Sequence, residues 1–389
     1  MAVLRIAVVT PELPSREYPN RGSSVYQTLR QLGQYAQLQA MCPLPRYPAR
    51  LQPRRFDYRE VDLSYSLPDV STKYFEYPAL PVVTRPVNGF TCAHYLEPYV
   101  RKFQADVLLN FLLYPAGFAA LSVGRKLGIP VVVGSIGSDM NAIPDPVSRW
   151  FTRKTLQGAS KVIAKSGQLR DRILAMGVNP EKTCVVANGC DGNIFFVRDR
   201  DSARRELNIP QSAELIAFVG RVHTRKGIGE LLDAVAALLR TRPHLRMVCV
   251  GDGPSLTEMQ ERAHTSNLVD RVDFPGACSP SDVARWLAAA NLLALPSYAE
   301  GCPNVVIEAL SCGRPIVATR VGSIPELVDP SCGVLVPLGD PAALTQALDR
   351  ALNTQWDEAA IAKRFRRSWQ QVAQEVLAVC QSSWSDARA

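Results

Sequence analysis

The chain of 389 residues is too long for one ordinary hydrophobic core and fits two domains of roughly 150–200 residues each. Its hydrophobic fraction of 47% is typical of a globular protein, and no stretch approaches the roughly 18 uninterrupted apolar residues that span a bilayer. Residues 1–10 are apolar but contain Arg5 and lack a small-residue cleavage site, so we expect a first strand rather than a signal peptide. The sequence therefore predicts a cytoplasmic protein.

The ten cysteines are spread singly, without a C-x-x-C pair, and the four histidines are scattered as well. Spacing of this kind predicts free thiols in a reducing compartment rather than a disulfide framework. Because a zinc site needs clustered ligands, we expect no structural metal.

A net charge of +8 leaves nucleic acid, an anionic membrane surface or an anionic small substrate as classes of partner. The basic residues cluster in the Pro-rich stretch 46–55 (Arg46, Arg50, Arg54 and Arg55), at 149–154 and at 363–367. No nucleic-acid-binding pattern accompanies them, so we expect no nucleic acid. Basic residues beside Trp150 and Phe151 suit a peripheral contact with an anionic membrane, and a solvated basic helix face that packs one aromatic ring fits them equally well.

Strand and helix patterns alternate through the first half of the chain. Helical spacing from Val25 to Ala36 follows Gly22-Ser23-Ser24 and predicts a helix with a serine as its N-cap. A second helix is expected at 116–128, and the Pro- and Tyr-rich segment 43–98 is expected to be irregular. Strands are expected at 5–10, 106–111, 130–134, 161–164 and 183–187. This alternation predicts a parallel sheet covered by helices.

The alternation restarts after the Asn-, Gly- and Asp-rich segment 188–200, which marks a domain boundary. A helix is expected at 228–240, and strands at 214–219, 246–251, 292–296, 315–318 and 333–336. The sequence therefore predicts two α/β domains with doubly wound, Rossmann-like sheets, which face one another across a cleft at the carboxyl ends of their strands. We assign residues 1–190 to the first domain, 191–364 to the second, and 365–389 to a C-terminal helix that crosses back to the first.

Two segments of the second half carry the chemistry. Glu300 and Glu308 flank a Pro-Asn helix start directly after a predicted strand, where the backbone N–H groups of residues 304–306 suit a phosphate. Glu308 is placed to accept both hydroxyls of a ribose, and Glu300 to accept sugar hydroxyls. In the loop 220–227, Arg221 and Lys226 precede another helix and are placed to neutralise a diphosphate.

In order and spacing these segments resemble glycosyltransferase family 4, whose members have the GT-B fold. The matching patterns are G-R-x4-K-G at 220–227, G-D-G-P at 251–254 and E-G-x-P-N-x3-E at 300–308, with further matches at 309–319 and 322–326. The resemblance covers most of residues 184–337 and is looser in the first half, through Arg21-Gly22, Tyr114-Pro115 with Gly117, and Gly137-Ser138-Asp139. The chain looks most like bacterial exopolysaccharide or teichuronic-acid assembly enzymes.

The resemblance implies a role for each matched position. Arg221, Lys226 and Glu300 are the implied catalytic groups, with Glu308 on the ribose. Further implied donor-binding positions are Gly220, Gly251, Ala277, Gly301, Cys302, Pro303, Asn304 and Val305. Gly22, Ser23, Ser138 and Asp139 are implied on the acceptor side. The resemblance also implies that anomeric configuration is retained and that no metal or other cofactor is needed. The partners that it implies are a UDP- or GDP-sugar and a glycan or lipid-linked acceptor.

One position departs from the family pattern. Many members carry His before the Gly-x-Asp turn of the first domain, and Ile136 stands there in this chain. The sequence therefore does not identify the catalytic polar groups on the acceptor side. Asp139 either lines the acceptor pocket or caps the turn. Asp199-Arg200-Asp201 spells the D-x-D metal signature of another fold, but it precedes a helix in a polar linker, so we expect a capping role.

Three other function classes compete with a transferase. A dinucleotide-dependent oxidoreductase needs a G-x-G-x-x-G turn after a strand, which is absent. A glycan phosphorylase uses pyridoxal phosphate and a much longer chain. A catalytically inactive GT-B protein that serves as partner or scaffold of another transferase stays as the alternative because of Ile136. We favour catalysis because Arg221, Lys226, Glu300 and Glu308 are all present.

Overall fold

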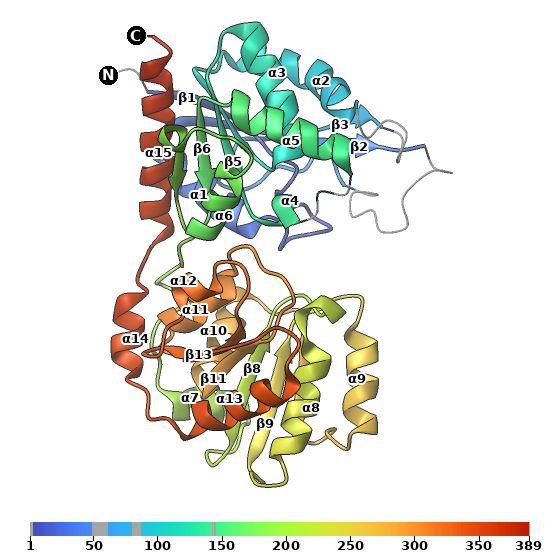
Figure 1. Cartoon of the computed structure of the whole chain (residues 1–389), viewed down its shortest axis with the longest axis vertical. Helices are drawn as coiled ribbons and strands as arrows, with labels where there is room; N and C mark the ends of the chain where they lie inside the picture. Colours follow the sequence, from blue (N-terminus) through green and yellow to red (C-terminus); the bar gives the residue numbers. More distant parts are fainter. Residues whose placement is uncertain (1–2, 49–60, 80–86, 142, 144, 389) are drawn as a thin grey trace. The chain divides into compact units, whose positions relative to one another are not determined.

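The computed structural model describes residues 3–48, 61–79, 87–141, 143 and 145–388. The chain divides into two compact units, Met1–Asn188 with Trp369–Ala389, and Gly189–Ser368. These boundaries lie two and four residues from those expected at 190 and 364, because the last helix begins at Trp369. Each unit is a parallel sheet covered by helices (Figure 1). Arg50, Arg54 and Arg55 of the basic stretch lie outside the described residues.

The N-terminal unit contains a seven-stranded sheet in the order β3-β2-β1-β4-β5-β6-β7, and each strand pairs in parallel with its neighbours. Its strands are β1 Arg5–Val9, β2 Gln37–Arg46, β3 Thr72–Pro78, β4 Val107–Phe111, β5 Val131–Ser135, β6 Lys161–Ala164 and β7 Thr183–Val185. Its helices are α1 Ser23–Leu32, α2 Asn88–Phe103, α3 Phe118–Leu127, α4 Ser138–Asn141, α5 Pro146–Gly158, α6 Gly167–Leu174 and α15 Trp369–Asp386, with short turns η2 Leu113–Gly117 and η3 Pro180–Lys182.

Alternate side chains of the buried strands point to opposite faces of this sheet and build two cores. Ala7 and Val9 belong to the core under α2 and α3, whereas Ile6 and Val8 belong to the core under α1 and α15. Helix α15 therefore covers the N-terminal sheet beside α1, although it comes from the other end of the chain (Figure 1).

The expectation of an irregular segment at 43–98 is wrong, because β3 lies within it and β2 and α2 overlap its two ends. The prolines of β2 are tolerated by their place in the sheet. Pro43 and Pro45 follow the last pairing of β2 with β1, Val9 with Met41, so their missing N–H groups face the side where β1 has ended. The predicted serine cap of α1 is also wrong, since Gly22 is the N-cap with φ 57° and both serines lie inside the helix.

The C-terminal unit contains a six-stranded parallel sheet in the order β10-β9-β8-β11-β12-β13. Its strands are β8 Glu214–Val219, β9 Leu245–Val250, β10 Val272–Gly276, β11 Leu292–Leu295, β12 Ile316–Thr319 and β13 Gly333–Val336. Its helices are α7 Arg200–Glu206, α8 Ile228–Leu238, α9 Leu256–Thr265, α10 Pro280–Ala289, α11 Asn304–Ser311, α12 Ile324–Leu327, α13 Pro341–Asn353 and α14 Glu358–Arg364, with the 3-10 turn η4 Thr224–Lys226.

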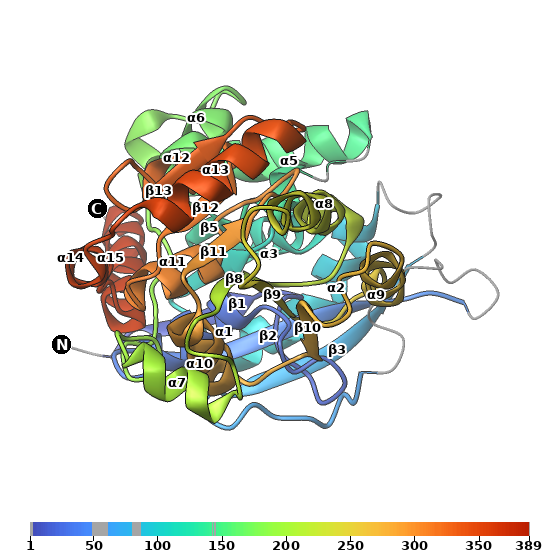
Figure 2. The same cartoon turned by 90° about the horizontal axis from the view of Figure 1, so that it is seen from below.

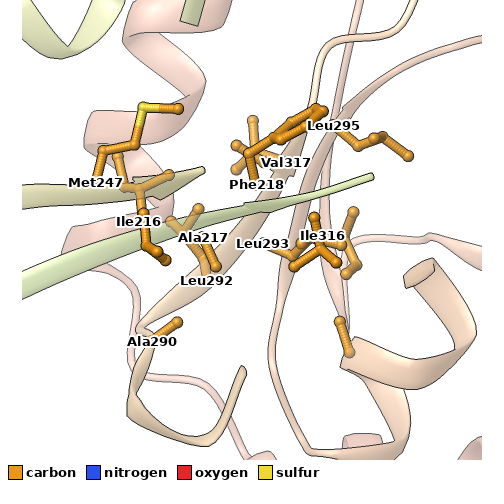
Figure 3. Close-up of a cluster of buried hydrophobic side chains, with 14 of the residues drawn as sticks. Ile216, Ala217, Phe218, Met247, Ala290, Leu292, Leu293, Leu295, Ile316 and Val317 are labelled. Carbon is orange, nitrogen blue, oxygen red and sulfur yellow. The ribbon is translucent and has the colours of Figure 1, made fainter. Parts of the chain in front are cut away.

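Helices cover both faces of this second sheet. Helix α8 packs against α9 and α13, while α10 packs against α7 and α11, in agreement with the view of Figure 2. Strand residues such as Phe218, Leu293 and Val317 are completely buried between these layers (Figure 3). The expected doubly wound α/β architecture is therefore confirmed in both units.

A buried cation fixes α14 to the second sheet. The Arg314 side chain is fully buried, and its guanidinium donates to the carboxylate of Glu358 and to the carbonyls of Cys312 and Ala290. Arg200 donates to the same carboxylate, and burial lowers the pKa of Arg314 to about 10. Asp199, as expected, caps α7 by accepting from the backbone N–H of Ser202.

The strand order reverses between β1 and β4 in one sheet and between β8 and β11 in the other. Ligands of doubly wound folds bind outside the carboxyl ends of the strands at these switch points. Each unit therefore has one edge at which a site is expected. Within the described part of the chain, no helix is long and apolar enough to cross a membrane.

Candidate functional site

Four loops meet at the carboxyl edge of the C-terminal sheet, after β8, β9, β11 and β12. Backbone hydrogen bonds join them pairwise. The N–H of Val222 donates to the carbonyl of Asp252 at 2.9 Å, and that of Tyr298 to Arg225 at 2.9 Å. The N–H of Ser323 donates to Gly301 at 3.0 Å. The loop that carries Lys226 is thereby held against the loop that carries Glu300.

Glycine is required where these loops approach one another most closely. Gly251 has a φ of 142°, and a Cβ on it would lie 1.9 Å from the carbonyl oxygen of Gly220. A Cβ on Gly227, at φ 69°, would lie 2.1 Å from the carbonyl oxygen of Pro296. These contacts bring the backbone of three strand ends together and explain why glycines end the predicted motifs.

Lys226 and Glu300 form an ion pair across the switch point. The ammonium Nζ of Lys226 lies 2.6 Å from Oε1 of Glu300, and the Glu300 side chain is only 8% exposed. Lys226 belongs to η4 and Glu300 to the loop after β11, so the pair joins the two central strand ends. The sequence placed both residues in the site but did not reveal that they contact each other. A cation and a carboxylate thus stand side by side at this edge.

Glu308 lies in the second turn of α11 and faces no protein partner. Its carboxyl group makes no hydrogen bond or ion pair with any described residue. Burial raises the pKa of Glu308 from 4.5 to about 7. A half-buried carboxylate without donors is costly to keep charged, and a ligand that supplies hydroxyl donors would remove that cost.

Most of the other predicted donor-binding positions lie beside the Gly251 loop or between Glu300 and Glu308 in the sequence. Ala277 follows Gly276, whose carbonyl accepts from the N–H of Gly251 at 2.8 Å, so the end of β10 adjoins the Gly251 loop. Asn304 and Val305 begin α11, and the residues directly before them, Gly301, Cys302 and Pro303, are half-buried like them. One detail is wrong: the N–H of Val306, expected to be open to a phosphate, donates to the carbonyl of Pro303 at 3.2 Å.

Arg221 and His223 lie in the loop between Gly220 and η4. The Arg221 side chain is exposed, directly after Gly220 at the end of β8. His223 Nδ1 accepts from the backbone N–H of Arg225 at 3.1 Å, so the imidazole caps η4. The imidazole is therefore engaged within its own loop.

The residues predicted on the acceptor side lie at the carboxyl edge of the N-terminal sheet. A Cβ on Gly22 would lie 2.1 Å from the carbonyl oxygen of Glu12, so only glycine fits there, at the start of α1 beside Ser23. Ser138 is exposed at the start of α4. Ile136, at the departing position, is half-buried and packs against the core under α1.

Asp139 is occupied by its own loop. Its Oδ1 accepts from Ser135 Oγ at 2.8 Å and from the N–H of Gly137 at 2.9 Å, and Oδ2 accepts from the N–H of Leu113 at 3.3 Å. Burial raises the pKa of Asp139, and these hydrogen bonds oppose the rise. Of the two roles open at this position, the geometry favours the cap that ties the β5–α4 turn to η2.

Among residues that the structure describes, no group of three His, Cys, Asp or Glu side chains is placed to hold a metal ion.

The features that sequence reasoning missed at this site are the Lys226–Glu300 contact and the approach of Gly322 to Glu300. A Cβ on Gly322 would lie 2.4 Å from the Glu300 carbonyl oxygen. The sequence shows only that opposite charges and glycines follow predicted strands. Whether these residues are neighbours depends on the order of the strands in the sheet.

Comparison with known proteins identifies the class. Residues 5–189 match the model of a glycosyl transferase 4-like domain, and residues 213–354 match the model of glycosyl transferases group 1. The chain therefore belongs to the group 1, family 4-like glycosyltransferases, as the resemblance indicated.

Individual relatives are similar over different lengths. A D-inositol 3-phosphate glycosyltransferase of Segniliparus rotundus is 32% identical over 65% of this chain, and the match spans only 61% of that relative. A putative teichuronic acid biosynthesis glycosyltransferase, TuaC, of Bacillus subtilis is 27% identical, with 89% of each chain covered.

A solved structure supports the fold. Anabaena Alr3699/HepE, crystallised in complex with UDP, superposes with a TM-score of 0.73 at 18% identity, covering 98% of this chain and 100% of that one. The GT-B class expected from the sequence, with two parallel-sheet Rossmann-like domains, is confirmed.

Proposed function

We propose that this protein is a retaining glycosyltransferase that moves a sugar from a UDP- or GDP-sugar to a glycan or lipid-linked acceptor. The observation that carries the proposal is the Lys226–Glu300 ion pair at the β8/β11 switch point, in a unit that also holds Glu308, whose carboxylate has no partner among the described residues. A cation, an acceptor for sugar hydroxyls and an acceptor for ribose hydroxyls are the three groups that a nucleotide sugar needs.

The donor is bound by these groups in order along its length. Glu308 accepts the two ribose hydroxyls, Lys226 and Arg221 neutralise the diphosphate, and Glu300 accepts hydroxyls of the transferred sugar. The start of α11 adds the positive end of its helix dipole near the phosphate. Stabilising the negative charge of the leaving diphosphate is the main electrostatic task, and side-chain cations perform it without a metal ion.

The chemical step is a front-face displacement. The acceptor hydroxyl attacks the anomeric carbon from the side on which the diphosphate leaves, the carbon–oxygen bond to phosphate breaks, and a bond to the acceptor oxygen forms. A phosphate oxygen of the leaving group takes the hydroxyl proton, so the anomeric configuration is retained without an enzyme nucleophile. The Lys226 ammonium holds the charge that develops on that phosphate.

The cellular role rests on the relatives. TuaC is named for teichuronic acid biosynthesis, which favours a role in cell-surface polysaccharide or exopolysaccharide assembly. The UDP bound by HepE favours a uridine nucleotide. We place the reaction at the inner face of the cytoplasmic membrane, where a lipid-linked acceptor is accessible. The alternative, an inactive partner of another transferase, is favoured only by Ile136.

The test is nucleotide release from a panel of UDP- and GDP-sugars, with and without EDTA, followed by NMR of the anomeric proton in the product. We expect release from one donor class, unchanged by EDTA, and retained configuration. Glu300→Gln should lower the rate about a hundredfold, comparable to loss of one transition-state contact. Glu258→Gln, an exposed carboxylate on α9, is the matched control. A folded protein that releases no nucleotide from any donor would support the scaffold alternative.

A further inference from the structure

Four large apolar side chains are exposed together on the N-terminal unit. Val87 precedes α2 and Phe90 lies in its first turn, with 48% and 53% of their surfaces exposed. Val147 and Trp150 lie in the first turns of α5 and are 43% and 53% exposed. We refer to these four residues as the α2–α5 patch. Single exposed apolar residues need no explanation, but a contiguous group does.

The two halves of the patch meet over one buried ring. Phe151 lies with its ring centroid 4.9 Å from that of Trp150 and 5.8 Å from that of Phe90. Val147 lies three residues before Trp150 and therefore on the same face of α5. Both helices pack against α3 and η2, which places them on one side of the sheet (Figure 1).

The exposed rings contact a cluster of further aromatic side chains. Phe118 lies 4.9 Å from Phe90 and 4.7 Å from Phe151, both edge to face, and Tyr114 stacks on Phe151 at 5.2 Å. Phe151 itself is only 8% exposed. A solvated basic helix face that packs one aromatic ring would need Phe151 alone, so this alternative does not account for Phe90 and Trp150. Trp150 and Phe90 contact Phe151 of this cluster and still leave 53% of their surfaces exposed.

Three cations adjoin the patch without carboxylate partners. Arg149, Arg153 and Lys154 are exposed, and none of them forms an ion pair with a residue in the described ranges. The Lys154 ammonium lies 5.5 Å from the centroid of the Trp150 ring. Helix α5 contains no acidic residue, and Asp145 directly before it is the N-cap, accepting from the N–H and hydroxyl of Ser148 at 2.7 Å each.

We propose that the α2–α5 patch, with Arg149, Arg153 and Lys154, docks on a bilayer that contains anionic lipids. Valines and aromatic rings bury their apolar surface among the upper acyl chains, while the three cations meet phosphate headgroups at the level where Trp prefers to lie. Stacking on a sugar would use the rings but neither the valines nor three unneutralised cations. The biological purpose of this surface rests on the proposed function: it holds the enzyme at the membrane, where a lipid-linked acceptor is found.

The cations are tested by vesicle flotation. The full chain should bind vesicles of phosphatidylglycerol and phosphatidylethanolamine and not vesicles of phosphatidylcholine, with binding weakened by salt. Arg149→Gln, Arg153→Gln and Lys154→Gln together should weaken binding about a hundredfold, since each basic residue near an anionic surface contributes a factor of about five. The matched control removes three exposed cations of the C-terminal unit: Arg240→Gln, Lys363→Gln and Arg366→Gln. Equal losses in the two triple variants would overturn the proposal.

The apolar part is tested separately. Phe90→Ser with Trp150→Ser should weaken binding to the same vesicles about tenfold or more, because apolar area no longer leaves water. Val269→Ser with Leu338→Ser, two exposed apolar residues of the other unit, should change nothing. A protein that dimerises through this patch in solution and ignores vesicles would also overturn the proposal, as judged by sedimentation velocity.

Nucleotide binding separates this inference from the proposed function. All four variants should bind UDP like the unaltered protein, because none of the substituted residues lies in the loops that carry Arg221, Lys226 and Glu300 or in helix α11 with Glu308. Vesicle binding without nucleotide binding would refute the transferase and leave the docking surface intact. Nucleotide binding without vesicle binding would do the reverse.

Discussion

Glu308 should make nucleotide affinity depend on pH. In the free protein burial raises the pKa of this carboxyl group from 4.5 to about 7. Ribose hydroxyls that donate to the carboxylate favour its charged form and return the pKa toward its ordinary value. Binding then releases a proton at any pH between these two values, so the affinity falls as the pH falls through about 7.

The size of the effect follows from the two pKa values. At pH 5.5, with a free-state pKa of about 7, roughly one molecule in thirty carries an ionised Glu308. If the bound-state pKa is close to 4.5, the affinity at pH 5.5 is therefore about thirtyfold lower than at pH 8. Glu308→Gln removes the titrating group and should bind weakly with little further dependence on pH.

Titration calorimetry with UDP at pH 5.5, 6.5 and 8, in two buffers of different ionisation enthalpy, measures both the affinity and the protons released. The terminal phosphate of UDP titrates in the same range, but it does so with both proteins, so the ratio of wild type to Glu308→Gln isolates the carboxyl group. Equal pH dependence in the two proteins, or tighter wild-type binding at pH 5.5, would refute the assignment of Glu308 to the ribose.

Three further changes test other parts of the site and fold. Because the pKa of Glu308 is raised to about 7 in the folded state, the free protein loses up to about 3 kcal/mol of stability as the pH rises from 4.5 to about 7; Glu308→Gln should therefore raise the melting temperature at pH 8 and leave it unchanged at pH 4. Lys226→Ala should lower kcat more than donor affinity, and equal effects in steady-state kinetics would argue against a role at the leaving group. Arg314→Met should cost about 1–3 kcal/mol in urea unfolding, because the buried carbonyls of Cys312 and Ala290 lose their donor, while Glu358 keeps Arg200 as a partner; a loss below about 0.5 kcal/mol would contradict that account.

The fold was predictable wherever an apolar run was uninterrupted. The strands expected at 214–219 and 333–336 agree with β8 and β13, because buried parallel strands are written in the sequence as continuous aliphatic residues. Prolines concealed β2, and only its pairing beyond the end of β1 explains why Pro43 and Pro45 are tolerated. The cap of α1 was misread because serine is the commoner cap, whereas close approach to Glu12 selects Gly22.

The site was predictable as a set of residues but not as an arrangement. Glu300, Glu308 and Lys226 could be named because each follows a strand and adjoins a helix start. Their relations could not, because they depend on the order of strands in the sheet. The Lys226–Glu300 contact joins residues far apart in sequence, and the absence of a described partner for Glu308 is a property of its surroundings. The same holds for Asp139, whose loop contacts decide between its two roles.

The most direct test of the central claim is a calorimetric and thermal-shift screen of the purified protein against UDP, GDP and ADP without added metal. The account predicts selective binding of one nucleotide, which is weakened in Glu308→Ala and unchanged in Glu258→Ala. Absence of binding to all three by the folded protein would contradict the transferase and favour an inactive scaffold.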